Sequence, residues 1–337
     1  MQLEPELMAE LETGADVIHL RRRMARNATL KFVQEYGIAV VAVLAVILIG
    51  VARENFLSYQ NISSLLYGVS LDFYVVVGFT FLLIMGEVDL SVGSVYALSG
   101  MTAGYLATQG LPLWLCLGSA LAIGAAVGAI NGALVVRLRI NSIILTIGTL
   151  LAVRGLADVV AAIMAGQRYA ENFRAVPHGR LFGISWTIIV MFVTVGLLEF
   201  VFARGATVRA IYYIGQNPKS ASIHGMPVDR FRMGGFVLSG MLAAFSGFLV
   251  AARVTIPDVN MGRQLEFNIL TAAVLGGASL YGGRGRVLNS TVALFVLAMI
   301  LNGLIMFGVE PALQQVMVGA VLVTIVVVDT RIHRERR

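Results

Sequence analysis

The sequence predicts an all-α membrane protein whose chain crosses the bilayer many times. Hydrophobic residues make up 58% of the 337 residues and charged residues only 13%, about half the charged fraction of an ordinary soluble domain. The apolar stretches run to about 20 residues, which is the length that a helix needs to cross a bilayer. They also lack the short alternating rhythm of a membrane β-barrel, so helices remain as the spanning elements.

Ten segments are predicted to cross or enter the membrane, with eight as the lower limit. They comprise residues 36–52, 62–85, 90–108, 113–136, 141–164, 184–203, 231–252, 269–281, 287–307 and 313–328. The segment 269–281 is too short to cross unaided. Because the glycine-rich sequence GGRGRV follows it, we expect a re-entrant or broken helix held inside the bundle.

The spans define a transmembrane domain over residues 36–328, flanked by two tails. Residues 1–35 turn from acidic to basic and lead into the first span, while residues 329–337 form a basic tail. With both tails in the cytoplasm, 18 of the 25 Lys and Arg residues lie inside and six outside. This bias obeys the positive-inside rule, and it accounts for the net charge of +6 without a nucleic-acid partner.

A polar stretch over residues 204–230 interrupts the run of spans on the cytoplasmic side. Its core reads as a short helix from Pro218 to His224. Asn217 is placed to cap its start, Pro218 suits the first helical position because it has no N–H to satisfy, and Gly225 suits a left-handed exit. A helix of about two turns is marginal in water, so we expect it to pack against the membrane domain or a partner protein.

The chemistry-bearing residues exclude several classes of activity. The four histidines lie in predicted tails or loops, which argues against a serine–histidine protease at membrane depth, and no two of them share a helical face for a metal. The single cysteine, Cys116, lies in an apolar run and is interpreted as a packing residue. Neither lysine follows a glycine, so there is no Walker A phosphate loop. We therefore predict no catalytic residue, metal or cofactor in this chain, and transport driven by an ion gradient or by an ATPase on another chain.

Three charged residues fall at membrane depth. Arg154 and Asp158 are four residues apart on one predicted helix, so they either pair with each other or form a proton relay. Asp72 has no evident partner in its own segment, and is either a functional polar group or satisfied by a neighbouring helix. Close glycine spacings, such as Gly124 and Gly128, allow helix backbones to approach each other. Three asparagines are expected to hydrogen-bond between helices; these are Asn131, Asn289 and Asn302.

Three motifs, in this order and spacing, carry a family resemblance. They are GEVDLSVGS at residues 86–94, GQNPKSASIHGM at residues 215–226 and AAVLGGASLYGGRGRVLNS at residues 272–290. Together they make residues 55–328 similar to the permease subunits of bacterial sugar ABC importers of the ribose, xylose, galactose and rhamnose type. The resemblance implies a fold of about ten helices in the inner membrane. It implies as partners an ATPase subunit with two nucleotide-binding domains, which would use the ATP and Mg²⁺, a periplasmic sugar-binding protein, a second copy or paralogue of the permease, and membrane lipid.

The resemblance also assigns candidate residues. Part of the second motif resembles the family's coupling helix, which seats in a cleft on the ATPase; its candidate residues are Gly215, Asn217, Pro218, Lys219, Ala221 and Gly225. The motif residues and possible pathway residues are Asp72, Gly86, Glu87, Asp89, Ser91, Gly93, Ser94, Asn131, Gly276, Gly277, Gly283 and Arg284. Asp89 either caps the next helix through the backbone of Ser91 or Val92, or takes a direct part in transport.

The chain departs from the family at Glu87, where a second glycine is usual, and at Asp72, where asparagine or a small residue is common. These acids either favour a polyhydroxylated or cationic solute or pair with a neighbouring arginine. Tyr212 and Tyr213 replace smaller residues and are candidates for tuning the pairing with the ATPase. The sequence thus predicts a permease subunit for a monosaccharide or related polyol. The alternatives are a branched-chain amino acid or nucleoside ABC importer and an ion-coupled secondary carrier.

Overall fold

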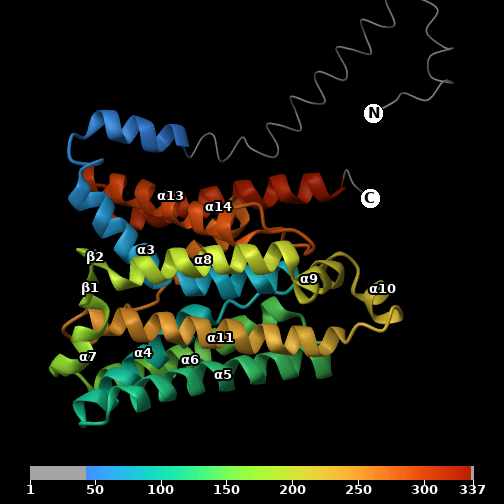
Figure 1. Ribbon diagram of the computed structural model, residues 1–337, viewed down its shortest axis with the longest axis horizontal. Helices are drawn as coiled ribbons and strands as arrows, with labels where there is room; N and C mark the ends of the chain where they lie inside the picture. The colour runs from blue at the N-terminus through green and yellow to red at the C-terminus, as the bar shows by residue number, and fades with distance from the viewer. Residues whose placement is uncertain (1–42, 335–337) are drawn as a thin grey trace, which may run out of the picture.

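The computed structural model describes residues 43–334, and α-helices make up most of this part of the chain (Figure 1). A short helix, Val43–Ala52, precedes the labelled ones. The longer helices are α3 (Tyr59–Ile84), α4 (Val92–Thr108), α5 (Leu113–Leu138), α6 (Ser142–Ile163), α8 (Trp186–Arg204), α11 (Val228–Arg253), α13 (Val287–Met306) and α14 (Pro311–Arg334). The shorter ones are α7 (Glu171–Ala175), the 3-10 helix η1 (Val176–His178), α9 (Ala206–Gln216), α10 (Pro218–Ile223) and α12 (Leu265–Leu275).

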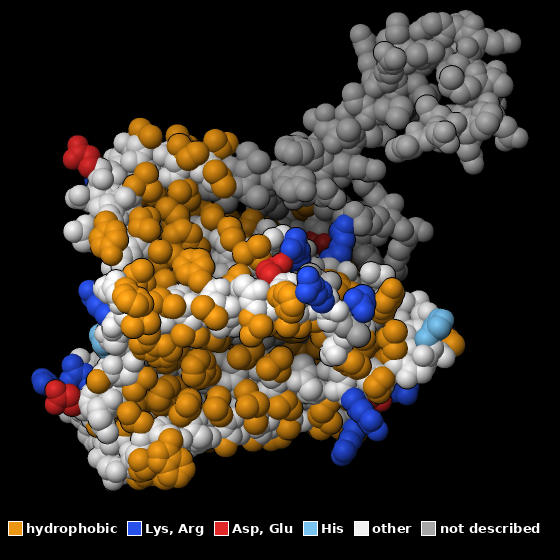
Figure 2. Space-filling model, in the orientation of Figure 1, with side chains coloured by type: hydrophobic (Ala, Val, Ile, Leu, Met, Phe, Trp, Pro, Cys, Tyr) orange, Lys and Arg blue, Asp and Glu red, His pale blue; other side chains and the backbone are white. Residues whose placement is uncertain are grey.

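One small antiparallel hairpin interrupts the helices. Its strands are β1 (Arg180–Leu181) and β2 (Ile184–Ser185), with Arg180 opposite Ser185. The hairpin lies at one end of the bundle and α10 at the other (Figure 1). We refer to these as the hairpin end and the α10 end. Figure 2 shows hydrophobic side chains over the middle of the visible face and most charged side chains toward its two ends, as expected for a bundle that crosses a membrane.

The predicted all-α, multi-pass architecture is confirmed in its coarse form. Each of the ten predicted segments coincides with a helix, the first of them only from Val43 onward, where the described residues begin. Six helices in the described part are long and apolar enough to cross a membrane, or seven if α8 and α9 form one bent span. The exact number of spans and the cytoplasmic location of both termini stay predictions.

The structure describes only part of the two predicted tails. Residues 1–35 and 335–337 lie outside the described residues. The predicted basic tail begins at residue 329, but α14 continues without a break to Arg334. The helix therefore extends past residue 328, where the last predicted span ends, and the boundary of the membrane domain stays a prediction.

Three helices form the centre of the bundle. Of the 17 residues of α4, 13 are buried, and 78% and 67% of the most apolar stretches of α3 and α11 are buried against 17% in α6 and 11% in α14. The outer helices thus turn most of their apolar side chains away from the protein. Those side chains face either lipid or another protein chain, because exposing so much apolar surface to water is unfavourable.

Glycines let the central helices come into backbone contact. Gly124 and Gly128 lie one turn apart on α5 and face α11, where a Cβ added to Gly124 would lie 2.3 Å from the carbonyl oxygen of Gly240. A Cβ added to Gly240 would in turn lie 2.2 Å from the oxygen of Gly124. This confirms the close approach predicted from the glycine spacing, since small residues at a helix interface maximise packing where no hydrophobic effect drives association. Cys116, on the same helix, is buried and has a free thiol, as its packing interpretation requires.

The segment around α12 is a broken one, as predicted. After α11 the chain runs in from the hairpin end without regular helix as far as Gly262, whose Cβ would lie 2.3 Å from the oxygen of Gly93 at the start of α4. The 11-residue α12 then continues toward the α10 end and is too short to cross alone. It begins at Leu265, four residues before the predicted segment. At Gly262 this irregular backbone packs against α4, and the Gly262 oxygen accepts a hydrogen bond from Arg154 of α6.

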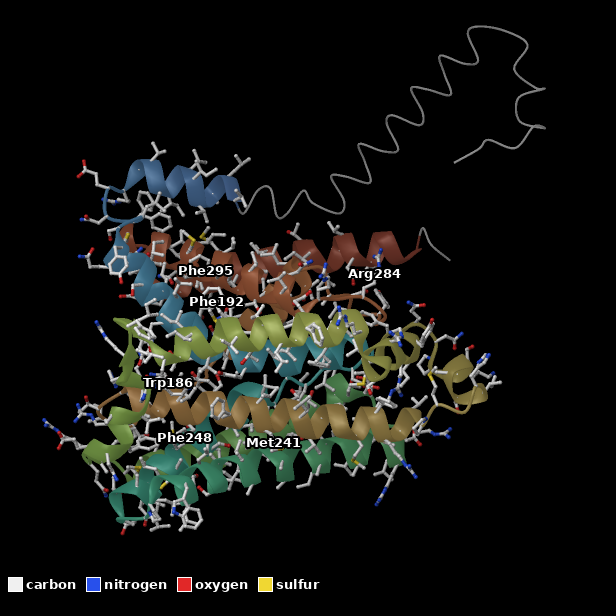
Figure 3. The ribbon with its side chains drawn as sticks, in the orientation of Figure 1. Trp186, Phe192, Met241, Phe248, Arg284 and Phe295 are labelled. Carbon is white, nitrogen blue, oxygen red and sulfur yellow. The ribbon has the colours of Figure 1, made fainter. Side chains whose placement is uncertain are left out.

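Aromatic residues fix the hairpin end. Trp186, at the start of α8, donates its indole N–H to the carbonyl oxygen of Val176 at 2.8 Å, and Phe248 on α11 meets Phe173 edge to face with ring centres 5.2 Å apart. Figure 3 shows Trp186 and Phe248 toward this end. These contacts hold α7, η1 and the hairpin against the central helices.

We predict that Gly124→Ala destabilises the membrane domain by about 1–3 kcal/mol, the usual cost of inserting a methyl group into a closed contact. The matched control is Gly118→Ala on the same helix, where an added Cβ meets nothing within 4 Å. The control is expected to be neutral or to stabilise by up to about 1 kcal/mol, because alanine loses less backbone entropy on folding. Thermal unfolding of the two purified variants in detergent measures the difference, and equal unfolding temperatures would contradict the glycine contact.

Candidate functional site

The helix α10 is formed by the caps that the sequence indicates. The Asn217 side chain accepts a hydrogen bond from the backbone N–H of Ser220 at 2.9 Å, and Pro218 occupies the first turn. Gly225 has φ of +78°, which favours glycine, and the N–H of Met226 closes the end on the oxygen of Ala221 at 3.1 Å. The helix is six residues long and His224 is its C-cap, one residue shorter than predicted.

α10 rests on the bundle through a small contact and leaves its other side exposed. Ala221 is its one buried residue and belongs to an apolar cluster with Ile214 of α9 and Val228 of α11. Ile223 is 76% exposed, and Lys219 and His224 are also exposed. A six-residue helix with an exposed isoleucine therefore projects from the end of the bundle on a narrow base.

The helix before it, α9, is a feature that the sequence prediction missed. Val208, Ile211 and Ile214 are buried along it, at the three-residue spacing of one helical face. That spacing is present in the sequence, but the polar residues between them concealed it. α9 lies directly before α10 and links it to the core, so the segment 204–230 contains two helices and not one.

The three sequence motifs meet at one place, which we call the glycine junction: Ile84, Gly86, Gly215, Gly282 and Gly283. A Cβ on Gly215 would lie 1.8 Å from the carbonyl oxygen of Ile84 and 2.5 Å from the backbone nitrogen of Gly283. A Cβ on Gly282 would lie 2.7 Å from the oxygen of Gly215 and 2.9 Å from the nitrogen of Gly86. Three segments far apart in the sequence are therefore packed backbone to backbone at the end of α3.

Hydrogen bonds close the glycine junction. The N–H of Gly283 donates to the oxygen of Ile84 at 2.8 Å, and the Tyr212 hydroxyl of α9 donates to the oxygen of Gly285 at 2.5 Å. Tyr212 thus contacts the third motif within this chain, whereas Tyr213 is 57% exposed beside it. While these contacts hold, any displacement of α9 also moves α3 and the α12–α13 loop.

The loop that carries the third motif is anchored on two further helices. The Asp329 carboxylate of α14 accepts hydrogen bonds from the Ser279 hydroxyl and from the N–H of Leu280, both at 3.1 Å. Arg286 forms an ion pair with Glu199 of α8 at 2.5 Å. Arg284 lies on this loop toward the α9 end of the view in Figure 3, and its backbone oxygen accepts from the N–H of Ser279 at 3.2 Å.

The two glycines that open the third motif have different surroundings. A Cβ on Gly276 would lie 2.6 Å from Cα of Ser290 on α13, so this glycine is required by close packing. Gly277 has φ of +90° but open space around it, so it is required by backbone conformation. Together they turn the chain sharply out of α12.

In the first motif, Asp89 belongs to a buried network of hydrogen-bonded side chains. It accepts hydrogen bonds from the N–H of Ser91 at 2.9 Å and from the Ser91 hydroxyl at 2.5 Å. Asn131 of α5 donates to that hydroxyl at 3.0 Å and accepts from Thr149 of α6 at 2.7 Å. The interhelical hydrogen bond predicted for Asn131 is therefore confirmed. Asp89 bonds the backbone of Ser91 as predicted, but this bond closes the turn before α4 and does not cap the helix, whose N-cap is Ser91 itself. Burial raises the pKa of the Asp89 carboxyl above its ordinary value, and the hydrogen bonds from Ser91 and Asn131 offset this in part.

The remaining residues of this motif hold α4 in place. The Ser94 hydroxyl donates to the oxygen of Leu150 on α6 at 2.9 Å. Gly93 allows the α12 segment to approach, because a Cβ there would lie 2.1 Å from Oε2 of Glu266 and 2.6 Å from the oxygen of Gly262. Both positions are therefore explained by packing at the start of α4.

Glu87 pairs with an arginine, one of the two roles expected for it. Its Oε1 lies 3.2 Å from Nε of Arg232 on α11, with the Glu87 side chain 8% exposed and that of Arg232 25% exposed. The pair borders a polar cavity of about 650 Å³ at the α10 end, which Arg137 and Asp229 also line. The negative charge that departs from the family pattern is thus compensated within the chain.

Asp72 is satisfied by a neighbouring helix, which was one of its two expected roles. The Tyr96 hydroxyl of α4 donates to Oδ1 of Asp72 on α3 at 3.0 Å. The positive charge of Arg253 also acts on Asp72, and this guanidinium stacks over the Tyr67 ring at 5.0 Å. Asp72 therefore sits in a polar contact between α3, α4 and the end of α11.

The expected pairing of Arg154 with Asp158 is wrong. Arg154 instead donates from Nη1 to the oxygen of Met261 at 2.7 Å and from Nη2 to the oxygen of Gly262 at 3.0 Å. The helix spacing made the Asp158 pair possible, but the irregular segment before α12 presents two free carbonyls that a guanidinium satisfies with better geometry.

The other two asparagines differ from each other. Asn61 of α3 donates to Oδ1 of Asn302 on α13 at 2.9 Å, which confirms an interhelical hydrogen bond for Asn302. Asn289 is exposed and makes no side-chain hydrogen bond with the described residues. Of the histidines in the described part, His178 and His224 are exposed and lie outside the long helices, as predicted. His333 lies in the last turn of α14, which extends into the predicted tail.

Comparison with known proteins identifies the family. Residues 61–326 match the family described as "Branched-chain amino acid transport system / permease component". The chain is 33% identical over 316 residues to the L-arabinose ABC transporter permease protein of Azospirillum brasilense, covering 93% of this chain and 92% of the relative. It is 27% identical over 303 residues to the ribose import permease protein of Haemophilus influenzae, covering 89% and 94%.

A third relative has a different named cargo. The autoinducer 2 import system permease protein of Yersinia enterocolitica is 30% identical over 320 residues, covering 90% of this chain and 87% of the relative. No solved structure matches the chain. The family match extends from the start of α3 into α14 and so includes the glycine junction and α10. The chain belongs to the family of permease components of these transport systems, and is a multi-pass membrane protein and not an enzyme.

Proposed function

We propose that this chain is the permease subunit of an ATP-binding-cassette importer for a monosaccharide or a related polyol. The family match supports the permease role, and the relatives named above that import L-arabinose and ribose support a sugar as cargo. The description of the family also names branched-chain amino acids, which keeps that solute class as the alternative. We favour a sugar over a branched-chain amino acid, because the similarity to these two sugar permeases covers about nine-tenths of this chain.

The partners follow from this function. An ATPase subunit with two nucleotide-binding domains supplies ATP hydrolysis and uses the Mg²⁺, so this chain needs no cofactor of its own. A periplasmic binding protein delivers the sugar, and a second copy or a paralogue of the chain completes the pathway. The nearly unburied α14 and α6 offer apolar surface for that second subunit and for lipid. The complex lies in the bacterial inner membrane with both termini in the cytoplasm.

The glycine junction is the observation that carries the mechanism. ATP binding in the partner chains brings the ATPase domains together and moves α10, whose exposed face they hold. α10 shares an apolar cluster with α9, and Gly215 of α9 packs directly on the Ile84 oxygen and on Gly283. From α9 the movement therefore reaches the end of α3 and the α12–α13 loop through backbone contacts, and it reorients the pathway by alternating access.

Energy coupling separates this proposal from an ion-coupled carrier. In whole cells or membrane vesicles, sugar uptake is expected to continue after an ionophore collapses the proton gradient and to stop when ATP is depleted. Asp72 accepts a hydrogen bond from Tyr96, and Arg154 donates to a backbone oxygen, so both side chains have structural partners within the chain. Uptake by the purified chain in liposomes without an ATPase would refute the importer.

Gly225, which ends α10, gives a second test of the proposed coupling. Gly225→Val places a β-branched residue at φ of +78°, which costs on the order of 1–2 kcal/mol and is expected to distort α10. We predict that uptake per ATP hydrolysed falls at least fivefold while the membrane domain stays folded. The matched control is Gly166→Val at the hairpin end, with φ of +77° and equally open surroundings. A normal ratio of uptake to hydrolysis in Gly225→Val would show that this cap does not matter.

Gly215→Ala tests the glycine junction. The matched control is Gly234→Ala on α11, where an added Cβ meets nothing within 4 Å. Alanine is the better helix former by about 1 kcal/mol, so any loss in Gly215→Ala reflects the contact with Ile84 and not the helix. We expect at least fivefold lower uptake in reconstituted vesicles for Gly215→Ala and unchanged uptake for Gly234→Ala. Equal uptake in both would mean that the backbone contact is not part of the coupling route.

A further inference from the structure

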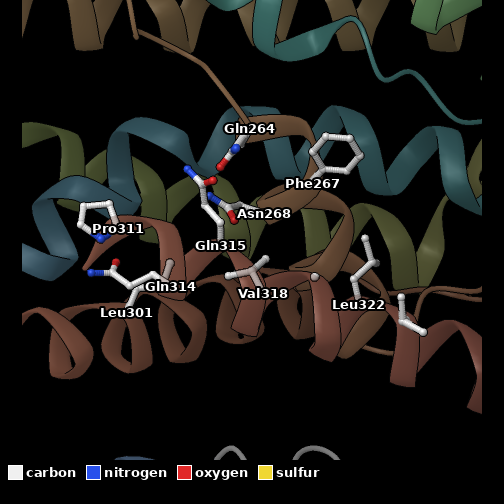
Figure 4. A pocket seen from close by; sticks show the side chains of 11 residues that line it. Gln264, Phe267, Asn268, Leu301, Pro311, Gln314, Gln315, Val318 and Leu322 are labelled. Atoms are coloured by element: carbon white, nitrogen blue, oxygen red, sulfur yellow. The ribbon is translucent and has the colours of Figure 1, made fainter. Parts of the chain in front are cut away.

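A cavity of about 470 Å³ lies between α12, α13 and α14 toward the hairpin end (Figure 4). Its volume falls within the range of about 300–1,000 Å³ that is usual for small-molecule sites. Apolar side chains form most of its wall, among them Phe267, Val318 and Leu322. It is separate from the glycine junction and from the polar cavity beside Glu87.

Three carboxamides converge on this cavity without partners. Figure 4 shows Gln264, Asn268 and Gln315 turned toward one another, and none of the three makes a side-chain hydrogen bond with the described residues. A fourth, Gln314, differs because its Nε2 donates to the oxygen of Val309 at 2.8 Å. Each free carboxamide offers two N–H donors and one oxygen acceptor, and none carries a charge.

Gln264 and Gln315 are exposed and Asn268 is half-buried, so their carboxamides are accessible to a solute in the cavity. A polyol matches them well, because each hydroxyl both donates and accepts a hydrogen bond. The Phe267 ring, 42% exposed, adds an apolar surface for the C–H face of a sugar ring. A cationic or anionic solute does not match, because no charged side chain lines the cavity.

The backbone at the mouth of the cavity is held in an unusual conformation. Gln264 has φ of +63°, a left-handed conformation that is uncommon for a residue other than glycine. Strained residues of this kind concentrate at functional sites, where the surrounding structure holds them. Arg154 supplies that support, because its hydrogen bonds to the oxygens of Met261 and Gly262 fix the chain just before Gln264.

We propose that this cavity is a binding site for a monosaccharide in the permease, with Gln264, Asn268 and Gln315 hydrogen-bonding its hydroxyl groups. The site rests on the proposed function, since it needs a sugar as the cargo. In it, Phe267 stacks on the sugar ring, and Arg154 is a positioning residue that acts through the backbone before Gln264.

The test uses the whole transporter, with its own ATPase and binding protein, in proteoliposomes supplied with L-arabinose or ribose. Asn268→Leu and Gln315→Leu remove a carboxamide but keep a side chain of similar size. Each is expected to lower ATP-driven uptake at least tenfold and to change the ratio of L-arabinose to ribose uptake. Asn268→Gln, which keeps the carboxamide, is expected to recover part of the uptake. The matched control is Gln109→Leu, an exposed carboxamide at the end of α4, which is expected to leave uptake unchanged.

Two results would overturn the site while leaving the proposed function intact. One is normal uptake and normal sugar preference in both leucine variants. The other is a loss of uptake that accompanies loss of the second permease subunit on size-exclusion chromatography, since the carboxamides would then serve a protein contact. If the unaltered transporter imports neither sugar with ATP, the proposed function itself fails for these sugars, and the site falls with it.

Discussion

The contact of Gly215 and Gly283 with the carbonyl oxygen of Ile84 is the constraint on which the α10 end of the bundle depends. It brings α3, α9 and the α12–α13 loop within backbone distance, and no side chain larger than hydrogen fits at Gly215. Side-chain contacts can absorb a small movement by changing rotamers, but backbone contacts cannot. The position of α9, and therefore of α10, is thus fixed by the end of the central helix and not by the surface loops.

Several charged side chains inside the bundle have local partners. Asp72 accepts from Tyr96, Glu87 pairs with Arg232, and Arg154 binds two backbone oxygens. Such pairing lowers the cost of placing charge away from water. The carboxamides around the α12–α14 cavity differ from these side chains, since they make no side-chain hydrogen bond with the described residues.

Much of the architecture could be predicted because membrane helices are specified locally. Apolar length located the ten helical segments, and the types of residue at Asn217, Pro218 and Gly225 located the ends of α10. Each of these signals lies within a few residues of the feature it determines. The same holds for Asp89, whose partner Ser91 is two residues away.

The features that sequence reasoning missed depend on tertiary contacts. Arg154 has an acidic residue four positions along its own helix, yet it binds carbonyls more than 100 residues away. No local pattern reveals those carbonyls, because they are free only where the chain departs from helix before α12. The carboxamides at Gln264 and Gln315 likewise come together from two separate segments. Three motifs were recognised separately, but nothing in their spacing indicated that their glycines touch.

The narrow base of α10 has a consequence for how such a complex changes over evolutionary time. One small side chain, Ala221, anchors the helix, while Lys219, Ile223 and His224 face outward. Substitutions on that outward face leave the apolar cluster beneath it undisturbed. With α10 in its proposed role as the ATPase contact, the choice of ATPase can diverge among related permeases without altering the membrane bundle, so that duplicated transporters acquire separate ATPases while retaining one architecture.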